Sequence, residues 1–139
     1  MRNRNFVRLM FCDEQAQTLF ADWPVKARDL VAFLHMDAGR HPDDPALAEL
    51  VGELSVHSGL FRRLWAQHPV HDKGHATVTI SHPVVGTMQL SYEALRLPDD
   101  PDQTLVTYSA EPASEALLAL RLLASWHADV HTRSVACTR

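Results

Sequence analysis

The densest group of residues that could do chemistry lies in the run His68-Pro-Val-His71-Asp72-Lys-Gly-His75. Imidazole and carboxylate groups are common zinc ligands, so three histidines beside an aspartate suggest a metal site. Their spacing, however, crosses a predicted helix end and a loop, so it does not place three ligands on one helix face. We therefore expect exposed loop histidines and no metal. A small metal-dependent enzyme that uses His68, His71 and His75 is the least favoured alternative.

An acid–base pair formed by His82 and Glu93 is a second candidate for chemistry. Glu93 is one step out of phase with Tyr92 in an alternating segment, so its side chain points to the opposite face. The sequence has no Ser-His-Asp or Cys-His arrangement, and its five glycines are scattered singly rather than gathered in a phosphate-binding loop. Cys12 and Cys137 lie at opposite ends of the sequence and form no CxxC motif, so we expect both to be free thiols of a cytosolic protein. We expect no catalytic residue and no cofactor.

Length and charge limit the class of protein. The chain has 139 residues, enough for one domain with a real core, and a net charge of -4. Because affinity for phosphate comes mainly from clustered lysine and arginine, this balance argues against direct nucleic-acid binding. No apolar run reaches the length of a membrane span, and the N-terminus lacks the apolar core of a signal peptide. We expect a cytoplasmic protein that does not bind membranes.

Three strands are predicted in the second half of the chain. Residues 77–80 are rich in β-branched side chains, and residues 87–92 and 104–110 alternate apolar with polar side chains. Turn-forming residues at 83–86 and a proline- and aspartate-rich run at 98–102 separate these segments. The pattern predicts an antiparallel meander that is apolar on one face, and such a face must be covered by helices.

Helices are predicted before and after the three strands along the sequence. Apolar residues recur at helical spacing between positions 5 and 68, and Asp13, Asp22 and Ser58 are placed to cap three of the helices. A leucine-rich helix, apolar on more than one side, is expected at residues 116–126. We assign residues 1–126 to one domain and residues 127–139, which lack periodicity, to a flexible tail.

An apolar cleft between the predicted helices and the sheet is the remaining candidate site. Its residues share an apolar or aromatic side chain on the inner face of a predicted element. Each is first of all a core residue, and spacing alone does not show a pocket. The candidate ligand contacts are Leu30, Leu34, Leu50, Leu54, Phe61 and Trp65 on the helices and Met88, Leu90, Tyr92, Val106 and Tyr108 on the sheet.

Several strings of the sequence, in the same order, resemble one known family. They are Asp22-Trp23, the stretch GRHPDDPALAELVGELSVHSGLFRRLWAQHPV from Gly39, the stretch HPVVGTMQLSYEALRLPDDPDQTLVTYSAEP from His82, and ALRLLAS from Ala119. The chain closely resembles the MmyB-like transcription-regulator ligand-binding domain over about residues 4–125. The resemblance implies a PAS-like α+β fold, here with N-terminal helices, a three-stranded antiparallel sheet and a C-terminal helix.

Members of this family look like bacterial regulators in which a helix-turn-helix DNA-binding domain precedes a PAS-like sensor domain. The resemblance implies that the apolar cleft binds a small apolar effector such as a fatty acid, and that the domain is not an enzyme. It defines no individual binding residue. A dimerisation or interaction module without a ligand is the main alternative, supported by the several apolar sides of the final helix.

The sequence departs from the family pattern at its N-terminus. Only four residues precede Asn5, where a typical member has the helix-turn-helix and the first two strands of the sheet. We therefore expect no direct DNA binding by this chain and an incomplete PAS-like sheet. In the family's topology the final strand pairs with the first, so residues 104–110 are expected to leave an open edge beside Val106 and Tyr108. This predicts a homodimer that covers the edge or the adjoining face.

Overall fold

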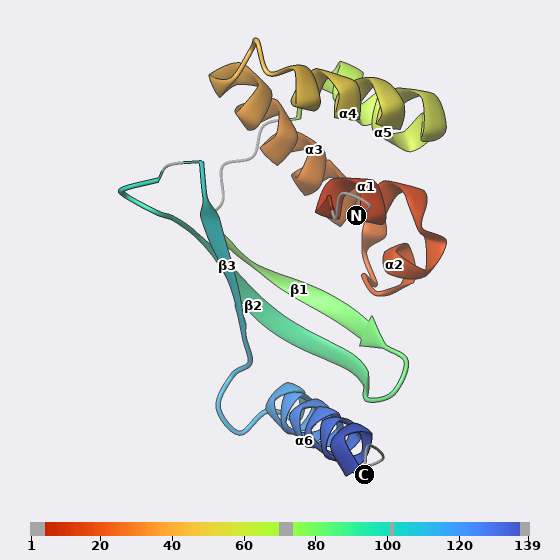
Figure 1. The fold of residues 1–139 in the computed structure, drawn as a ribbon, viewed down its shortest axis with the longest axis vertical. Coiled ribbons are helices and arrows are strands. Elements are labelled where there is room, and N and C mark those ends of the chain that lie inside the picture. Colours follow the sequence, from red (N-terminus) through yellow and green to blue (C-terminus); the bar gives the residue numbers. More distant parts are fainter. Residues whose placement is uncertain (1–4, 70–73, 101, 137–139) are drawn as a thin grey trace. The chain divides into compact units, whose positions relative to one another are not determined.

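The computed structural model describes residues 5–69, 74–100 and 102–136. In this part of the chain five helices are followed by three strands and a sixth helix (Figure 1). The chain divides into two compact units: residues 1–73, called the helical unit, and residues 74–139, called the sheet unit. The described elements form an α+β fold in the predicted order, so the predicted fold class is confirmed. The assignment of residues 1–126 to one ligand-binding domain stays a prediction.

The helical unit contains α1 (Phe6–Cys12), α2 (Glu14–Thr18), α3 (Trp23–Arg40), α4 (Pro45–His57) and α5 (Gly59–Gln67). Two of the predicted caps are present. The Asp13 carboxylate accepts a hydrogen bond from the backbone N–H of Gln15, and the Ser58 hydroxyl accepts one from the N–H of Phe61. These side chains satisfy N–H groups that have no partner within their own helix.

The start of α3 differs from the prediction in one detail. Asp22 occupies the N-cap position, but its side chain makes no capping hydrogen bond. Pro24, in the first turn, fixes φ at a helical value where a missing N–H costs nothing, so the helix starts there without a side-chain cap.

The core of the helical unit forms where the apolar faces of α1, α3, α4 and α5 meet. Leu54 and Phe61 are fully buried, and the Phe61 ring lies edge-on to Phe11 with 5.1 Å between centroids. An ion pair joins α1 to α4, because Arg8 Nε donates to Glu53 Oε1 at 2.9 Å and Arg8 Nη2 donates to Oε2 at 2.5 Å. The hydrogen bonds from Arg8 lower the pKa of the Glu53 carboxyl.

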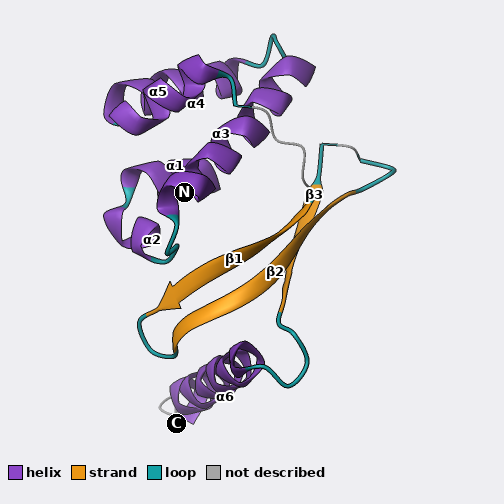
Figure 2. Ribbon diagram, turned by 180° about the vertical axis from the view of Figure 1, so that it is seen from behind, coloured by secondary structure: helices purple, strands orange, loops and turns teal. Residues whose placement is uncertain are grey.

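The sheet unit contains β1 (His75–His82), β2 (Gly86–Arg96), β3 (Thr104–Ser109) and α6 (Glu115–Ala136). The strands are antiparallel in the order β1-β2-β3, which confirms the predicted meander (Figure 2). Gly86 has a φ of 79° in the hairpin between β1 and β2, a left-handed conformation that glycine adopts without strain. Leu90 is paired with Val78 and Tyr92 with Tyr108, so the apolar residues of the three strands share a face.

Helix α6 covers part of that face and continues further than the sequence predicted. The Ser114 hydroxyl accepts a hydrogen bond from the Leu117 N–H and starts the helix, as expected from the break before it. The predicted end at Trp126 is wrong, because α6 runs to Ala136. Residues 127–136 contain neither proline nor glycine, so nothing in their composition stops the helix even though their apolar period is weak. None of the helices in the described ranges is long and apolar enough to cross a membrane.

Candidate ligand-binding site

The predicted contacts on the helices are placed in the core of the helical unit. Trp65 is partly buried, and its ring stacks on that of Phe61 with 5.7 Å between centroids. The helical period therefore identified the inward-facing side of each helix correctly, whereas a ligand-binding role for these residues stays a prediction. The buried members of the set are Leu30, Leu34, Leu50, Leu54 and Phe61.

A stack of rings beside Trp65 was not predicted from the sequence. The His35 ring stacks on Trp65 with 3.7 Å between centroids and on His68 with 4.6 Å. His35 Nε2 also lies 2.9 Å from the Trp65 carbonyl oxygen. His35 comes from α3, Trp65 from α5 and His68 from the cap that follows, so no local spacing signals the contact. His68 is exposed after the end of α5, as expected, and its ring takes part in this stack.

The histidine group considered as a metal site is not assembled in the described residues. His68 belongs to the ring stack, His75 is exposed on β1, and His71 lies outside the described residues. Within the described ranges, no group of three or more His, Cys, Asp or Glu residues could hold a metal ion. The alternative of a metal-dependent enzyme therefore gains no support from the geometry.

The pair His82 and Glu93, rejected on the basis of alternation, is also separated along the sheet. His82 lies opposite Gly86, at the hairpin end of β1, whereas Glu93 lies opposite His75 at the other end. Seven residues along a strand span about 23 Å, which is too far for proton transfer between two side chains.

Two of the predicted sheet contacts belong to the core between the sheet and α6. Met88 and Leu90 are each 3% exposed and pack with Ala116 and Ala119 of α6. Further apolar residues surround these four, so a substitution here changes the stability of the sheet unit before it tests ligand binding. They are Val78, Ile80, Val85, Ala110, Leu120 and Leu123.

The same face continues along the strands as the group Tyr92, Ala94, Val106 and Tyr108, which we call the tyrosine patch. Tyr92 follows Leu90 by two residues and so lies on the same face, and the register pairs Tyr92 with Tyr108 and Ala94 with Val106. The two tyrosine rings lie 6.1 Å apart between centroids. Tyr92 is buried, whereas Val106 and Tyr108 are 46% and 41% exposed. The patch therefore offers apolar surface that α6 does not use.

Two polar features border this patch. Burial raises the pKa of the Tyr108 phenol, so the hydroxyl is neutral at pH 7 and can both donate and accept a hydrogen bond. Arg96 is exposed on β2 two residues after Ala94, so it extends the same row of side chains. Sequence reasoning missed Arg96 because a charged residue near a strand end is usually only solvated. Its position places a cation at the end of an apolar row.

Comparison with known proteins gives two findings. No match is found among curated protein sequences. A family model described as the MmyB-like transcription regulator ligand binding domain matches residues 1–123, which include the described helices of the helical unit, the three strands and the first part of α6. The chain belongs to the family of MmyB-like transcription regulator ligand-binding domains.

Proposed function

We propose that this chain is the sensor part of a bacterial, cytoplasmic transcription regulator and that it binds a small apolar molecule with an anionic head, such as a fatty acid. Family membership supports the ligand-binding role and a non-catalytic domain. The observation that supports the chemical class is the tyrosine patch, with exposed Val106 and Tyr108 and with Arg96 in the same row. The candidate ligand contacts in the core of the helical unit stay predictions, because no exposed apolar surface with a neighbouring cation among the described residues supports them.

The chemistry of the patch favours a ligand of this kind. Covering Val106 and Tyr108 with an alkyl chain removes apolar surface from water, which stabilises a complex by roughly 25 cal/mol per Å². A carboxylate at the end of the chain can form a charge-assisted hydrogen bond with the Arg96 guanidinium. The neutral Tyr108 hydroxyl provides a second hydrogen-bonding group for the head. A neutral hydrocarbon would use only the first of these interactions.

Native mass spectrometry of the purified chain, followed by organic extraction, tests this proposal and separates it from its rivals. A fatty acid in the extract supports the sensor. Stoichiometric zinc would indicate a metal-dependent enzyme instead, and a stable dimer with neither ligand would indicate an interaction module. Binding of added palmitate to the extracted protein then gives an affinity that can be compared among variants.

Two neighbouring substitutions locate the site. Val106→Asp puts a carboxylate into the tyrosine patch, where desolvation costs several kcal/mol unless the charge is paired, so palmitate affinity should fall by about a hundredfold or more. Thr107→Asp makes the same addition one residue later, on the opposite face of β3, and should leave the affinity unchanged. Equal palmitate affinity of folded Val106→Asp and of the unaltered chain would refute the patch as the site.

We further propose that the chain forms a homodimer through α6. Leu118, Leu122 and Trp126 recur at intervals of four residues, and they are exposed by 58%, 61% and 49%. Such an apolar stripe on one side of a helix is typical of a surface that packs against another helix. Sedimentation of Leu122→Glu should show more monomer than the unaltered chain. Ala124→Glu, about 200° around the helix from Leu122, is the control and should sediment as the unaltered chain does.

A further inference from the structure

The face that carries the tyrosine patch is built from rows of side chains that cross the strands. Successive rows lie two residues apart along each strand, because alternate residues share a face. In order along β2, the rows pair Leu90 with Val78, Tyr92 with Tyr108, Ala94 with Val106, and Arg96 with Thr104. The first row packs against α6 and the last contains a cation, so the patch lies between two unlike ends.

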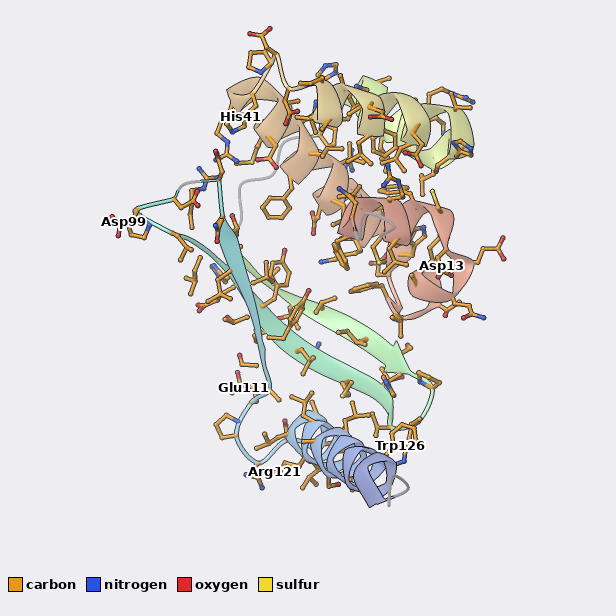
Figure 3. The ribbon with its side chains drawn as sticks, viewed as in Figure 1. Asp13, His41, Asp99, Glu111, Arg121 and Trp126 are labelled. Atoms are coloured by element: carbon orange, nitrogen blue, oxygen red, sulfur yellow. The ribbon has the colours of Figure 1, made fainter. Side chains whose placement is uncertain are left out.

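Helix α6 closes one end of the patch. Leu90 is 3% exposed and packs with residues of α6, and Ala110, after the end of β3, packs against the same core. Figure 3 marks this end of β3 by Glu111 and the other end by Asp99, at the tip of the connection from β2. Because Leu90 is already covered, an alkyl chain that lies along the patch cannot continue past Tyr92 in this direction.

Arg96, the last residue of β2, lies at the other end of the patch. Within the described ranges its guanidinium forms no ion pair, so it can bind the carboxylate of a ligand. Beyond Arg96, the connection to β3 carries the exposed residues Asp99, Asp100 and Asp102. Like charges repel, so a ligand carboxylate is disfavoured beyond Arg96. The head of an anionic ligand is therefore held at this row.

The distance between the two ends sets the length of the ligand that fits. Tyr92, Ala94 and Arg96 all lie on β2, the middle strand of the described sheet. Four residues of an antiparallel strand span about 13 Å. An extended alkyl chain advances about 1.3 Å per carbon, given a carbon–carbon bond of about 1.5 Å. About ten carbons therefore reach from Tyr92 to Arg96, and this length runs along the strands, so it does not depend on what lies beside β3.

We propose that the tyrosine patch selects fatty acids of medium chain length, about eight to twelve carbons, and that Arg96 fixes this length by holding the carboxylate. This inference rests on the proposed function, because it names the class of fatty acid that the same site takes. A shorter acid leaves part of the patch uncovered. A longer acid leaves carbons in water, because α6 stops its tail and the acidic connection repels its head.

Isothermal titration calorimetry of the extracted protein with saturated fatty acids, from hexanoate to palmitate, tests the proposal. Each added carbon should raise the affinity about twofold, because one side of each methylene is buried against the sheet. The affinity should level off between decanoate and dodecanoate. A steady rise as far as palmitate would overturn the selection by length and leave fatty-acid sensing intact. If no acid of any length binds, the proposed function fails as well.

Decanol tests the role of Arg96 without lengthening or shortening the ligand. The unaltered chain should bind decanoate about tenfold more tightly than decanol, because the alcohol makes no charge-assisted hydrogen bond. Arg96→Gln should remove this preference, whereas Arg96→Lys should retain most of it. Equal affinities of the unaltered chain for decanoate and decanol would show that no cation holds the head, and would overturn the role of Arg96.

Moving the cation along β2 tests whether its position sets the length. The double variant Ala94→Arg, Arg96→Thr shifts the guanidinium by one row, about 7 Å, towards α6. The affinity should then level off about five carbons earlier in the acid series. The matched control Leu95→Arg, Arg96→Thr puts the cation on the opposite face and should show no preference for decanoate over decanol. Circular dichroism checks that both variants are folded. Levelling at the same length in the unaltered chain and in the folded Ala94→Arg, Arg96→Thr variant would overturn the proposal.

Discussion

Replacement of Leu90 by alanine tests whether the sheet unit depends on its packing against α6. Leu90 is 3% exposed and packs with Met88, Ala116 and Ala119. The substitution removes three carbons, each worth about 0.8 kcal/mol of transfer free energy when buried, and it leaves a cavity that adds to the cost. We expect the free energy of unfolding of the sheet unit to fall by about 3 kcal/mol.

Amide hydrogen exchange measured by mass spectrometry is the suitable assay, because it reports on each unit separately. Where exchange requires opening of the sheet, a loss of about 3 kcal/mol should accelerate the exchange of β2 amides by roughly a hundredfold. Leu95→Ala is the matched control: Leu95 is on the same strand, on the opposite face, and 49% exposed. Its effect should stay within about 0.5 kcal/mol. Similar exchange rates in the two variants would refute the assignment of Leu90 to this core.

Two further predictions concern pH. Because hydrogen bonds from Arg8 lower the pKa of Glu53, this carboxylate stabilises the helical unit at pH values above the ordinary carboxyl pKa, and the contribution is lost as the pH falls through the lowered value. Glu53→Gln should therefore lower the thermal unfolding temperature at pH 7 but not in strong acid, and equal shifts at both would contradict it. Because burial raises the pKa of Tyr108, its stabilising effect is present below the ordinary tyrosine pKa and is lost as the pH rises through the raised value. An ultraviolet titration should show a late-ionising tyrosine that Tyr108→Phe removes and that bound palmitate shifts to still higher pH; an unchanged titration in Tyr108→Phe would contradict this assignment.

The sequence predicted the elements well because their apolar periods are strong and their ends carry clear signals. The change from a helical to an alternating period near Thr77 located the start of the sheet, and Gly86 and the aspartates after Pro98 located its turns. The end of α6 was not predicted, because a helix with a weak apolar period still continues where no residue stops it. Apolar periodicity therefore does not show where a helix such as α6 ends.

The candidate site was predicted less completely than the fold. Alternation identified the face that contains Leu90 and Tyr92, but it does not show that α6 covers Leu90 while Val106 stays exposed. That difference depends on where a helix lies across the strands, which is a long-range property. The stack of His35 on Trp65 is missed for the same reason, because thirty residues separate its members.

Val106 and Tyr108 contribute to two surfaces at once, since their side chains lie in the tyrosine patch and their backbone groups form the outer edge of β3. A ligand that orders these side chains on the face also orders the backbone of β3, and so changes the entropy cost of pairing a strand with its outer edge. Thermodynamic linkage requires the effect to be reciprocal: the factor by which the ligand strengthens or weakens strand pairing is the factor by which strand pairing changes the affinity for the ligand. One short strand would then couple ligand binding to the completeness of the sheet, without any movement of a distant element.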